Sequence, residues 1–532
     1  MSHYRFRVLV HAPGSRSPQD LPSPALRVAT ALRQDATVVV VDEPLPDQAA
    51  TRIHDEHLRM PFDAVIAADL QVVARLAEAG SFRGRLWPLI IEVSPLELVT
   101  GVGSPELAAA AAAARFVLCP DELTRSLVDV NTGSGARRTV VIPIDDLSTD
   151  PDDTVLRQAL GGLLQRAHPS EPTLATSGRP LRTVIAGHAL HFLDPLLEYL
   201  SELPEVELRV DRIPSFARHD EQASLENVQW ADVVFCEWCT PVAIWYSHHK
   251  QPGQRLIVRL HRYELDKEWP ARLDIDAVDQ VVCVGQHYAR LTLERTGWPA
   301  AKVTVVPNLV DVESFNRPKL PGAEFHLGFL GMVPRRKRLD LALDVLELLR
   351  RRDERFSLFV KTKMPWDDAW NRGDASEQAY ARGVFRRIQR SELLRDGFAF
   401  DRYGPDVAAW MRKIGFVLST SDDESFHLAP AEAMSSGGIP VVRNWPGSDE
   451  IYDPRWIYAD AAEMANGIYD IVSTGSFSEL GASAQLQARA SFDVSVVRDR
   501  FIQLLQHNLP PATVARGASS LSPERADTRS MP

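Results

Sequence analysis

The sequence has few cysteines, and their spacing is not typical of disulfides or metal sites. There are four among 532 residues, and three lie in or beside apolar runs, as small buried thiols do. Cys236 and Cys239 form one CxxC motif, but a zinc site needs a second pair or nearby histidine ligands. We therefore expect free thiols in a reducing compartment and no bound metal.

The sequence also lacks long apolar runs and an excess of positive charge. No run approaches the roughly 18 apolar residues of a membrane span, and no apolar signal segment stands near the N-terminus. The formal net charge is −12, which argues against a nucleic acid as main partner but leaves room for a local phosphate pocket. We expect a cytoplasmic protein that could contact the inner face of a membrane peripherally.

What the chain does contain is a regular alternation of short apolar runs with longer helical patterns. Examples of the runs are TVVVV (37–41), DVVFCEW (232–238) and FSLFVK (356–361). Apolar runs buried on both faces, with helices between them, predict parallel sheets built from βαβ units. The predicted fold class is α/β with doubly wound sheets, and the length of the chain predicts about three domains.

Stretches rich in Pro, Ser, Thr and Gly divide the chain. One precedes residue 181, and another occupies 316–325. The C-terminal stretch lacks aromatic residues and is predicted to be disordered. The predicted organisation is a first domain at 1–168, a linker at 169–180, a second domain at 181–318, a third domain at 319–480, a helical segment at 481–508 and a disordered tail at 509–532.

The first two domains share a sequence plan. PLIIEVSPLEL (88–98) aligns with RLIVRLHRYEL (255–265), and the distance from Cys119 to Pro143 equals that from Cys283 to Pro307. The shared spacing favours a duplication, although any two domains of this type share some of this rhythm. In this alignment His261 of the second domain is matched by Ser94 in the first.

The stretch SDDESFHLAPAEAMSSGGIPVV (421–442) contains two glutamates separated by seven residues. A predicted strand ends at Ser421, and ligands of open α/β sheets bind beyond the carboxyl ends of strands. The backbone N–H groups at the start of the next helix are suited to an anion, and Glu432 in its first turn is suited to the hydroxyls of a ribose. The alternative is that one glutamate caps the helix and the other is solvated. The predicted anion-binding N–H groups are those of Phe426, His427 and Leu428.

This stretch resembles the signature of retaining, nucleotide-sugar-dependent glycosyltransferases of the GT-B fold, family four, the glycogen-synthase-like superfamily. Glu424 and Glu432 match the family's E-x7-E, and Pro440-Val441-Val442 matches the turn that follows it. The resemblance covers about 181–508. It implies two facing Rossmann-like domains, with 181–318 as the acceptor half, 319–480 as the donor half and 481–508 as a crossover helix. The first domain is then an additional Rossmann-like domain, a degenerate copy of an acceptor half.

A second resemblance to this family lies in FHLGFLGMVPRRKRLDLALDVLELL (325–349). The family binds the diphosphate with backbone N–H groups at the glycine, an arginine just after it and a lysine six residues after it. Gly331 and Lys337 fit this pattern, whereas the arginine is replaced by Met332. Arg335 or Arg336 could supply the missing guanidinium, which suits phosphate bidentately.

The remaining site residues also follow from the resemblance. The segment from Phe400 to Tyr403 is expected near the nucleotide base. In the acceptor half, His261 ends a predicted strand near the transferred sugar, and Gly187 and His188 follow the first strand near the donor phosphate and the acceptor. A lone histidine such as His261 is otherwise more typical of a structural residue.

The resemblance implies transfer of a sugar from a nucleotide diphosphate to a glycan, lipid-linked or small-molecule acceptor with retention of configuration, first of all in cell-envelope polysaccharide synthesis. Lys337 and Arg336 would stabilise the leaving phosphate, and Glu424 and His261 would position the sugar. No cofactor and no metal are expected, and the oligomeric state is not predicted.

Three alternatives remain open. Met332, and His427 in place of the family's usual glycine, favour a catalytically inactive GT-B scaffold that binds a nucleotide sugar or a polysaccharide. A nucleotide-sugar epimerase of the same architecture fits the motifs less well. The first domain could also be the acceptor half, with the second as an insertion, but the direct continuity of the second domain into the third argues against this.

Overall fold

The computed structural model of the chain describes the second and third domains almost completely. It describes residues 179–510 apart from 216–218, 368–371 and 405. Of the first 178 residues it describes 6–11, 24–33, 36–59, 62, 64–78, 86–89, 111, 114, 116–132, 139–142, 156, 158–160 and 163. The predicted linker at 169–180 therefore lies outside the described residues except for Arg179 and Pro180, and so does the predicted tail from residue 511.

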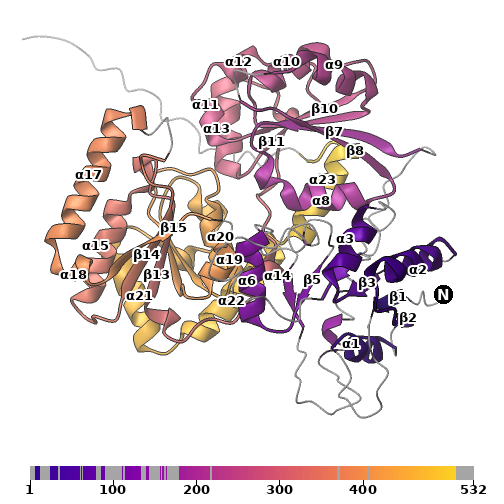
Figure 1. Cartoon of the computed structure of the whole chain (residues 1–532). Coiled ribbons are helices and arrows are strands. Elements are labelled where there is room, and N and C mark those ends of the chain that lie inside the picture. The colour runs from indigo at the N-terminus through magenta and orange to yellow at the C-terminus, as the bar shows by residue number, and fades with distance from the viewer. Residues whose placement is uncertain are drawn as a thin grey trace, which may run out of the picture.

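All the paired strands run parallel, as the apolar runs predict. The sheet of the first domain has the order β2-β1-β3-β4, with a separate pair β5-β6; the second domain has the order β12-β11-β10-β9-β7-β8; and the third has β15-β14-β13-β16-β17-β18. The predicted α/β fold class is thereby confirmed, and Figure 1 shows helices packed around each of the sheets. The strands are β1 (Phe6–His11), β2 (Ala36–Val41), β3 (Ala64–Ala67), β4 (Leu86–Pro88), β5 (Val117–Cys119), β6 (Thr139–Val141), β7 (Leu181–Gly187), β8 (Val206–Arg212), β9 (Val233–Glu237), β10 (Arg255–Leu260), β11 (Gln280–Cys283), β12 (Val303–Val305), β13 (His326–Leu330), β14 (Ser357–Thr362), β15 (Phe398–Arg402), β16 (Phe416–Ser419), β17 (Ile439–Arg443) and β18 (Ile457–Tyr458).

The helices connect successive strands. Those of the first and second domains are α1 (Pro24–Leu32), α2 (Pro46–Arg59), α3 (Leu70–Glu78), α6 (Glu122–Thr132), η1 (Leu190–Phe192), α8 (Asp194–Glu202), α9 (Glu221–Trp230), α10 (Pro241–His249), α11 (Arg262–Leu265), α12 (Trp269–Arg272), α13 (Gln286–Thr296) and η2 (Ala300–Lys302). The later ones are α14 (Val312–Phe315), η3 (Ala323–Phe325), η4 (Arg335–Lys337), α15 (Leu339–Arg350), α17 (Ala375–Arg390), α18 (Glu392–Arg395), α19 (Val407–Met411), α20 (Leu428–Ser435), η5 (Ser448–Glu450), η6 (Pro454–Trp456), α21 (Ala461–Ser473), α22 (Phe477–Ser491) and α23 (Val494–Gln506).

The first two domains share strand order and register. Val8 pairs with Ala64 as Thr183 pairs with Val233, and Cys119 pairs with Val141 as Cys283 pairs with Val305. The order β2-β1-β3-β4 in the first domain matches β8-β7-β9-β10 in the second, and a parallel bridge between Leu89 and Leu118 extends the match to β5 and β6. The described strands therefore follow one plan twice.

The register corrects the sequence alignment by three residues. Leu86 pairs with Val65 as Leu256 pairs with Val234, and Leu89 faces Leu118 as Arg259 pairs with Val282. Leu89 is therefore the counterpart of Arg259, and the counterpart of His261 is residue 91 rather than Ser94. Both 91 and 94 lie outside the described residues. The error arose because two apolar strand cores look alike in sequence, and an apolar run buried on both faces gives no alternation that would fix its register.

The chain passes between the second and third domains at two points. Val310 bonds through its backbone to Phe492 and Val494, which brings the two crossing segments together. Helix α22 packs on α14 and α20, whereas the apolar face of α23, including Val497 and Phe501, lies in a core cluster with strands of the second domain. The predicted boundary at 480/481 falls inside α22, so the crossing lies at 492–493. None of the helices among the described residues has the length and apolar character needed to span a membrane.

Candidate active site between the second and third domains

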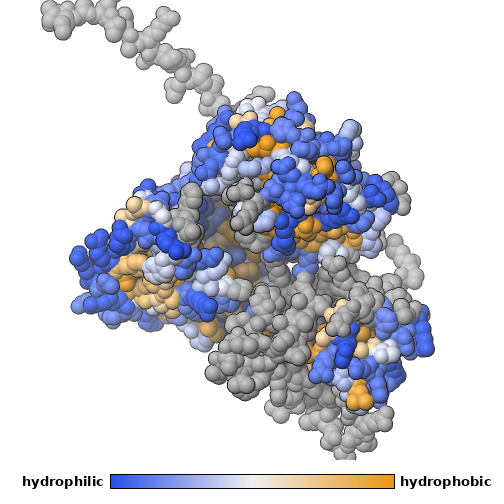
Figure 2. Space-filling model, turned by 45° about the horizontal axis from the view of Figure 1, so that its top comes forward, coloured by the Kyte–Doolittle hydropathy of each residue, from blue (hydrophilic) through white to orange (hydrophobic). Residues whose placement is uncertain are grey.

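The second and third domains meet at the carboxyl ends of β13 and β16. The Tyr288 hydroxyl on α13 donates to the Asp423 carboxylate (2.5 Å), and Arg262 of α11 lies 3.4 Å from the other oxygen of Asp423. On the same side, Arg290 pairs with Glu450. Residues from both domains enclose a hollow of about 210 Å³, and Figure 2 shows the surface indented where these domains meet. The loop that carries Asp423 and Glu424 is thus held against the second domain.

Two cations and a buried carboxylate form the centre of the site. Lys337 Nζ lies 2.6 Å from Glu424 Oε1, and Arg336 Nη1 lies 3.1 Å from the same oxygen. Arg336 also donates to the Asp423 carbonyl (2.7 Å). The basic turn η4 and the loop after β16 are therefore joined at one point, where Lys337, Arg336 and Glu424 meet; their roles toward a phosphate and a sugar stay predictions.

The ionisation of this cluster is set by opposing effects. Burial lowers the pKa of Lys337, and the neighbouring Arg336 and Arg262 add to this, while Glu424 opposes it. Burial alone would raise the pKa of Glu424, but the nearby Lys337 and Arg336 outweigh it and hold that pKa well below its usual range. Glu424 is therefore a carboxylate that stabilises the charged form of Lys337.

His427 occupies the N-cap position of the helix that follows, without a capping hydrogen bond from its side chain. Its backbone is left-handed (φ 55°) at the N-cap of α20, which accounts for the glycine that the resembling family has there. Trp445 donates to Ser419 Oγ (3.2 Å), and the same hydroxyl oxygen lies 2.6 Å from His427 Nδ1. Nε2 is buried and has no hydrogen-bond partner among the described residues. Burial, with Lys337 nearby, lowers the pKa of His427 to about 3.

The other residues predicted around α20 have different surroundings. Phe426 is buried and packs on Tyr452 and Phe492, so its side chain belongs to the core. Leu428 is the first residue of α20, and Glu432 is its fifth, which places Glu432 just past the first turn rather than in it. Burial is the main cause of the raised pKa of Tyr452. The charges of Glu424 and Glu432 raise this pKa further, so the two carboxylates act on one phenol.

Three predicted features of the basic turn need correction. The Gly331 N–H donates to the Lys361 carbonyl (3.0 Å), so it cannot also bind a phosphate. Met332 is buried in the core of the third domain, and the arginine that reaches the site from this turn is Arg336. Arg335 is exposed and its charge contributes to the lowered pKa of Asp374, mainly caused by hydrogen bonds from Ser376 and Glu377. Among the described residues, Arg335 takes no part in the ion pairs of Lys337 and Arg336 with Glu424.

A separate hollow at the carboxyl ends of β14 and β15 contains the residues predicted near a nucleotide base. It measures about 410 Å³, and Phe400 and Tyr403 are among its lining residues. Tyr403 is 58% exposed, and Lys363 Nζ lies 4.8 Å from the centre of its ring. An exposed aromatic ring beside a cation is suited to stacking on a heterocycle.

On the second domain, His261 is held by neighbours that the sequence analysis did not include. His261 Nε2 donates to Glu237 (2.9 Å), since a carboxylate can only accept, and its ring stacks on Trp238 at 4.1 Å. Burial would raise the pKa of Glu237, but Arg259 and His261 outweigh it and lower that pKa. Arg259 also donates to Asn308. Glu237 is the last residue of β9, after four buried apolar residues, and this position could have drawn attention to it.

The loop after β7 has a structural role that explains its glycine. A side chain at Gly187 would come within 2.8 Å of the Glu237 carbonyl and of Leu190, so no larger residue fits. His188 is exposed at the end of this strand. The sequence predicted a cleft role for both residues, and the structure adds a packing reason for Gly187 only.

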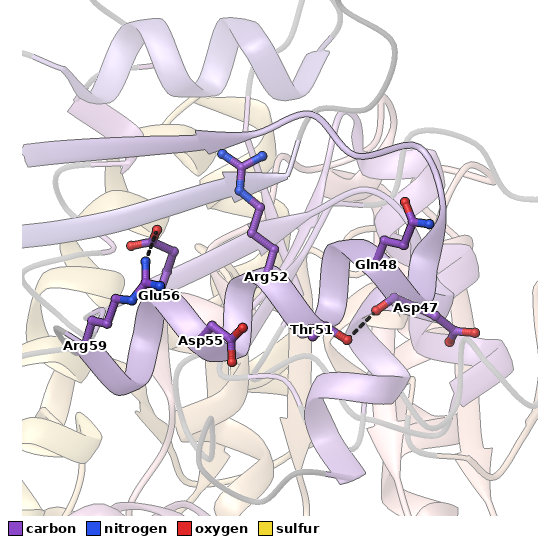
Figure 3. A pocket seen from close by; sticks show the side chains of 7 residues that line it. All are labelled: Asp47, Gln48, Thr51, Arg52, Asp55, Glu56 and Arg59. Carbon is purple, nitrogen blue, oxygen red and sulfur yellow. Dashed lines mark hydrogen bonds and ion pairs between the residues drawn. The ribbon is translucent and has the colours of Figure 1, made fainter.

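Two further features could mark a site: possible metal ligands and another surface hollow. Among the described residues no His, Cys, Asp and Glu side chains gather as a metal site would require, and all four cysteines are free and buried. A hollow of about 510 Å³ lies along α2 of the first domain. Figure 3 shows that its lining side chains come from this one helix, with the Glu56–Arg59 ion pair among them. It is the solvated face of a helix.

Comparisons with known proteins give matches to solved structures alone. No family model and no curated protein matches the chain. Alr3699/HepE of Anabaena, solved with UDP and glucose, is 16% identical and has a TM-score of 0.49. The match covers 99% of its chain and 61% of this one. A glycosyltransferase of Rickettsia africae is 12% identical, with 100% of its chain and 62% of this one covered and a TM-score of 0.48. A sucrose-phosphate synthase of Thermosynechococcus elongatus is 15% identical, with 98% and 61% covered and a TM-score of 0.46. The function proposed next rests on the geometry of the site.

Proposed function

We propose that this chain transfers a sugar from a nucleotide-diphosphate sugar to an acceptor hydroxyl, with retention of configuration. One observation carries the proposal: Lys337 and Arg336 converge on the buried Glu424, at the carboxyl end of a parallel sheet and beside the N-terminus of α20. Ligands of such sheets bind at this edge, and the site has two cations for one carboxylate, which suits a diphosphate.

In this reading the cluster stabilises the leaving group. Lys337 has three N–H donors, of which Glu424 engages one, so others can reach a phosphate oxygen. Glu424 holds Lys337 in place and keeps it charged in spite of burial. Charge develops on the diphosphate as the glycosidic bond breaks, and cations already in position stabilise that state more than the ground state. Arg336 takes the part expected of the arginine that Met332 replaces.

The reaction needs no protein nucleophile. The bond from the anomeric carbon to the diphosphate oxygen breaks, the acceptor hydroxyl oxygen bonds to the same face of that carbon, and its proton passes to the departing phosphate. Glu432 is proposed to bind the ribose, and the hollow beside Tyr403 the base. His261 is proposed to position the sugar from the second domain. A glycan, a lipid-linked glycan or a small molecule in cell-envelope polysaccharide synthesis is the proposed acceptor class, and the cytoplasm the proposed compartment.

Release of nucleotide tests this proposal without knowledge of the acceptor. The purified chain is incubated with a panel of uridine, guanosine and adenosine diphosphate sugars, and free nucleoside diphosphate is measured over hours. Slow hydrolysis of at least one donor is expected in the wild type and not in Lys337→Ala. Arg335→Ala is the matched control, because it removes an adjacent cation that lies outside the ion pairs with Glu424. Equal rates in all three proteins would contradict the assignment.

A second function, a scaffold that binds a nucleotide sugar without turning it over, is favoured by two observations. Met332 is buried where the resembling family has a cation, and the Gly331 N–H is already bonded to Lys361. Both remove groups that would stabilise a leaving phosphate. Binding of a donor sugar with no nucleotide release, both with and without candidate acceptors, would support the scaffold.

A further inference from the structure

Helix α6 of the first domain is joined to the third domain by four charged side chains and one backbone carbonyl, here called the α6 network: the side chains of Glu122, Arg125, Asp129 and Arg317 and the carbonyl of Ser314. Arg317 donates to Asp129 (2.6 Å) and to Glu122 (3.3 Å). The Ser314 carbonyl accepts from both Arg317 (3.0 Å) and Arg125 (3.0 Å). These bonds link residues that are nearly 190 positions apart in the chain.

The α6 network is closed to solvent. The side chain of Arg317 is 0% exposed and that of Asp129 is 2% exposed. Asp129 also accepts from Thr139 of the same domain (2.5 Å), so its oxygens are fixed from both sides. Breaking such a pair would leave a buried charge without a partner. Separating it therefore costs far more free energy than separating a surface ion pair does.

The partner of α6 moves with the third domain. Helix α14, just after the crossing at Val310, packs on α19, α20 and α22, and Figure 1 shows α6 beside it. Lys319, two residues after Arg317, donates to the Met411 and Ile414 carbonyls. Residues from 312 onward therefore belong to the body of the third domain, although the sequence placed them in the second.

The second domain uses the corresponding helix differently. The register of β5 and β11 makes α6 the counterpart of α13, which faces the third domain through Tyr288 and Arg290. The acidic partners of α13 are more open: Asp423 is 36% exposed and Glu450 is 28% exposed. Two copies of one helix thus contact the third domain, one through closed ion pairs and one through solvated pairs.

We infer that the α6 network locks the first domain to the third, so that these two form one rigid body and the second domain is the part that moves when the cleft opens and closes. The first domain then serves as a fixed brace rather than as a separate binding module. This inference does not depend on the proposed function, because it concerns motion of the ligand-free chain as well.

Distance distributions between spin labels test the inference in the full chain. The native cysteines are buried, so labels are attached to cysteines introduced at the exposed residues Asp47, Glu268 and Glu392, one in each domain. Without ligand, the distribution from Asp47 to Glu392 is expected to be narrow, and that from Asp47 to Glu268 broader. Asp129→Asn is expected to broaden the first to the width of the second. Arg290→Gln, which removes a pair on α13, is the matched control and is expected to leave the first unchanged.

The inference would be overturned if, in the wild type, the Asp47–Glu392 distribution were as broad as the Asp47–Glu268 one. It would also be overturned if Asp129→Asn left the width of the Asp47–Glu392 distribution unchanged. If Asp129→Asn fails to fold, hydrogen exchange in the wild type decides: the amides of α6 and α14 are expected to open together, and independent opening of α6 would contradict the lock. Added UDP is expected to shift only the distances to Glu268. Absence of any UDP effect with a narrow Asp47–Glu392 distribution would count against the proposed function and not against the lock.

Discussion

The first and second domains are built on the same strand order and register, but they differ at the carboxyl ends of their central strands. The second domain has Glu237 at the end of β9 and Arg259 in β10, buried and paired, with His261 bonded to the same carboxylate. The counterparts in the first domain are Ala68 and the fully buried Leu89. A sheet of this type therefore folds without the charged pair, so the fold alone does not require it.

The largest effect is expected when the charged pair of the second domain is replaced by the apolar residues of the first. Glu237→Ala alone leaves Arg259 buried without its carboxylate and is expected to cost about 3–5 kcal/mol of stability. Adding Arg259→Leu recreates the Ala68–Leu89 combination and is expected to restore most of that stability, because a buried ion pair contributes little against apolar residues of similar size. Nucleotide release is expected to stay low in both variants. Hydrogen exchange of the β10 amides measures the stability, and a double variant as unstable as the single one would contradict the account.

Charged side chains of the cleft are expected to contribute to nucleotide release, whereas those of the first domain are not. Lys337→Ala removes a cation placed on the leaving group and is expected to lower the rate of nucleotide release about 10²-fold or more. Arg52→Ala, on the solvated face of α2, is expected to leave the rate unchanged. The rates are measured at saturating donor, and a comparable loss in both variants would remove the distinction between the two regions.

Acidification is expected to affect the cleft loop through His427. Its folded pKa is lowered to about 3, below the value of about 6.5 in an unfolded chain, so the unfolded state binds the proton more tightly. Stability then falls as the pH drops from about 6.5 to 3, by up to about 1.4 kcal/mol per unit, and His427→Asn is expected to flatten this slope. Urea unfolding followed in this pH range measures it, and identical slopes for the two proteins would argue against a buried neutral imidazole.

The solvated contact of α13 is expected to give the smallest effect. Tyr288→Phe removes one hydrogen bond to the partly exposed Asp423 carboxylate, for which we expect a loss of about 1.5 kcal/mol, the lower end for a charged acceptor. We expect the closed state to be disfavoured, so that KM for the donor rises about two- to tenfold while kcat changes less. Thr124 is the counterpart on α6, and Thr124→Val serves as the comparison in steady-state kinetics. A larger effect from Thr124→Val would reverse the expected roles of the two helices.

Much of the fold could be predicted from the sequence, because apolar runs buried on both faces have few other uses. The strands, the α/β class and the repeated plan all followed from such runs. Their register did not, since LII and LIV present the same apolar surface in either alignment, and the counterpart of Arg259 was misplaced by three residues. Only the pairing of β4 with its neighbours corrected this.

The site was predictable where one motif supplied neighbouring side chains, and not where distant segments meet. The family pattern assigned Lys337 and Glu424 to one site, but it did not predict that these two side chains form an ion pair with each other. Among three consecutive basic residues, however, the sequence could not tell which pair with Glu424, and Arg335 does not. Asp423 with Tyr288 joins positions 135 apart, a partnership that only the packing of two domains creates. The α6 network was missed for the same reason.

The central claim is that the cleft between the second and third domains binds a nucleoside diphosphate through Lys337 and its partners, whereas the described residues of the first domain form no such site. Titration calorimetry of UDP and GDP against the wild type, Lys337→Ala and Arg335→Ala tests it most directly. We predict that one nucleotide binds the wild type and Arg335→Ala with similar affinity and that binding to Lys337→Ala is about 10-fold weaker or more, the loss of one charge-assisted contact. Equal binding to all three proteins would contradict the account.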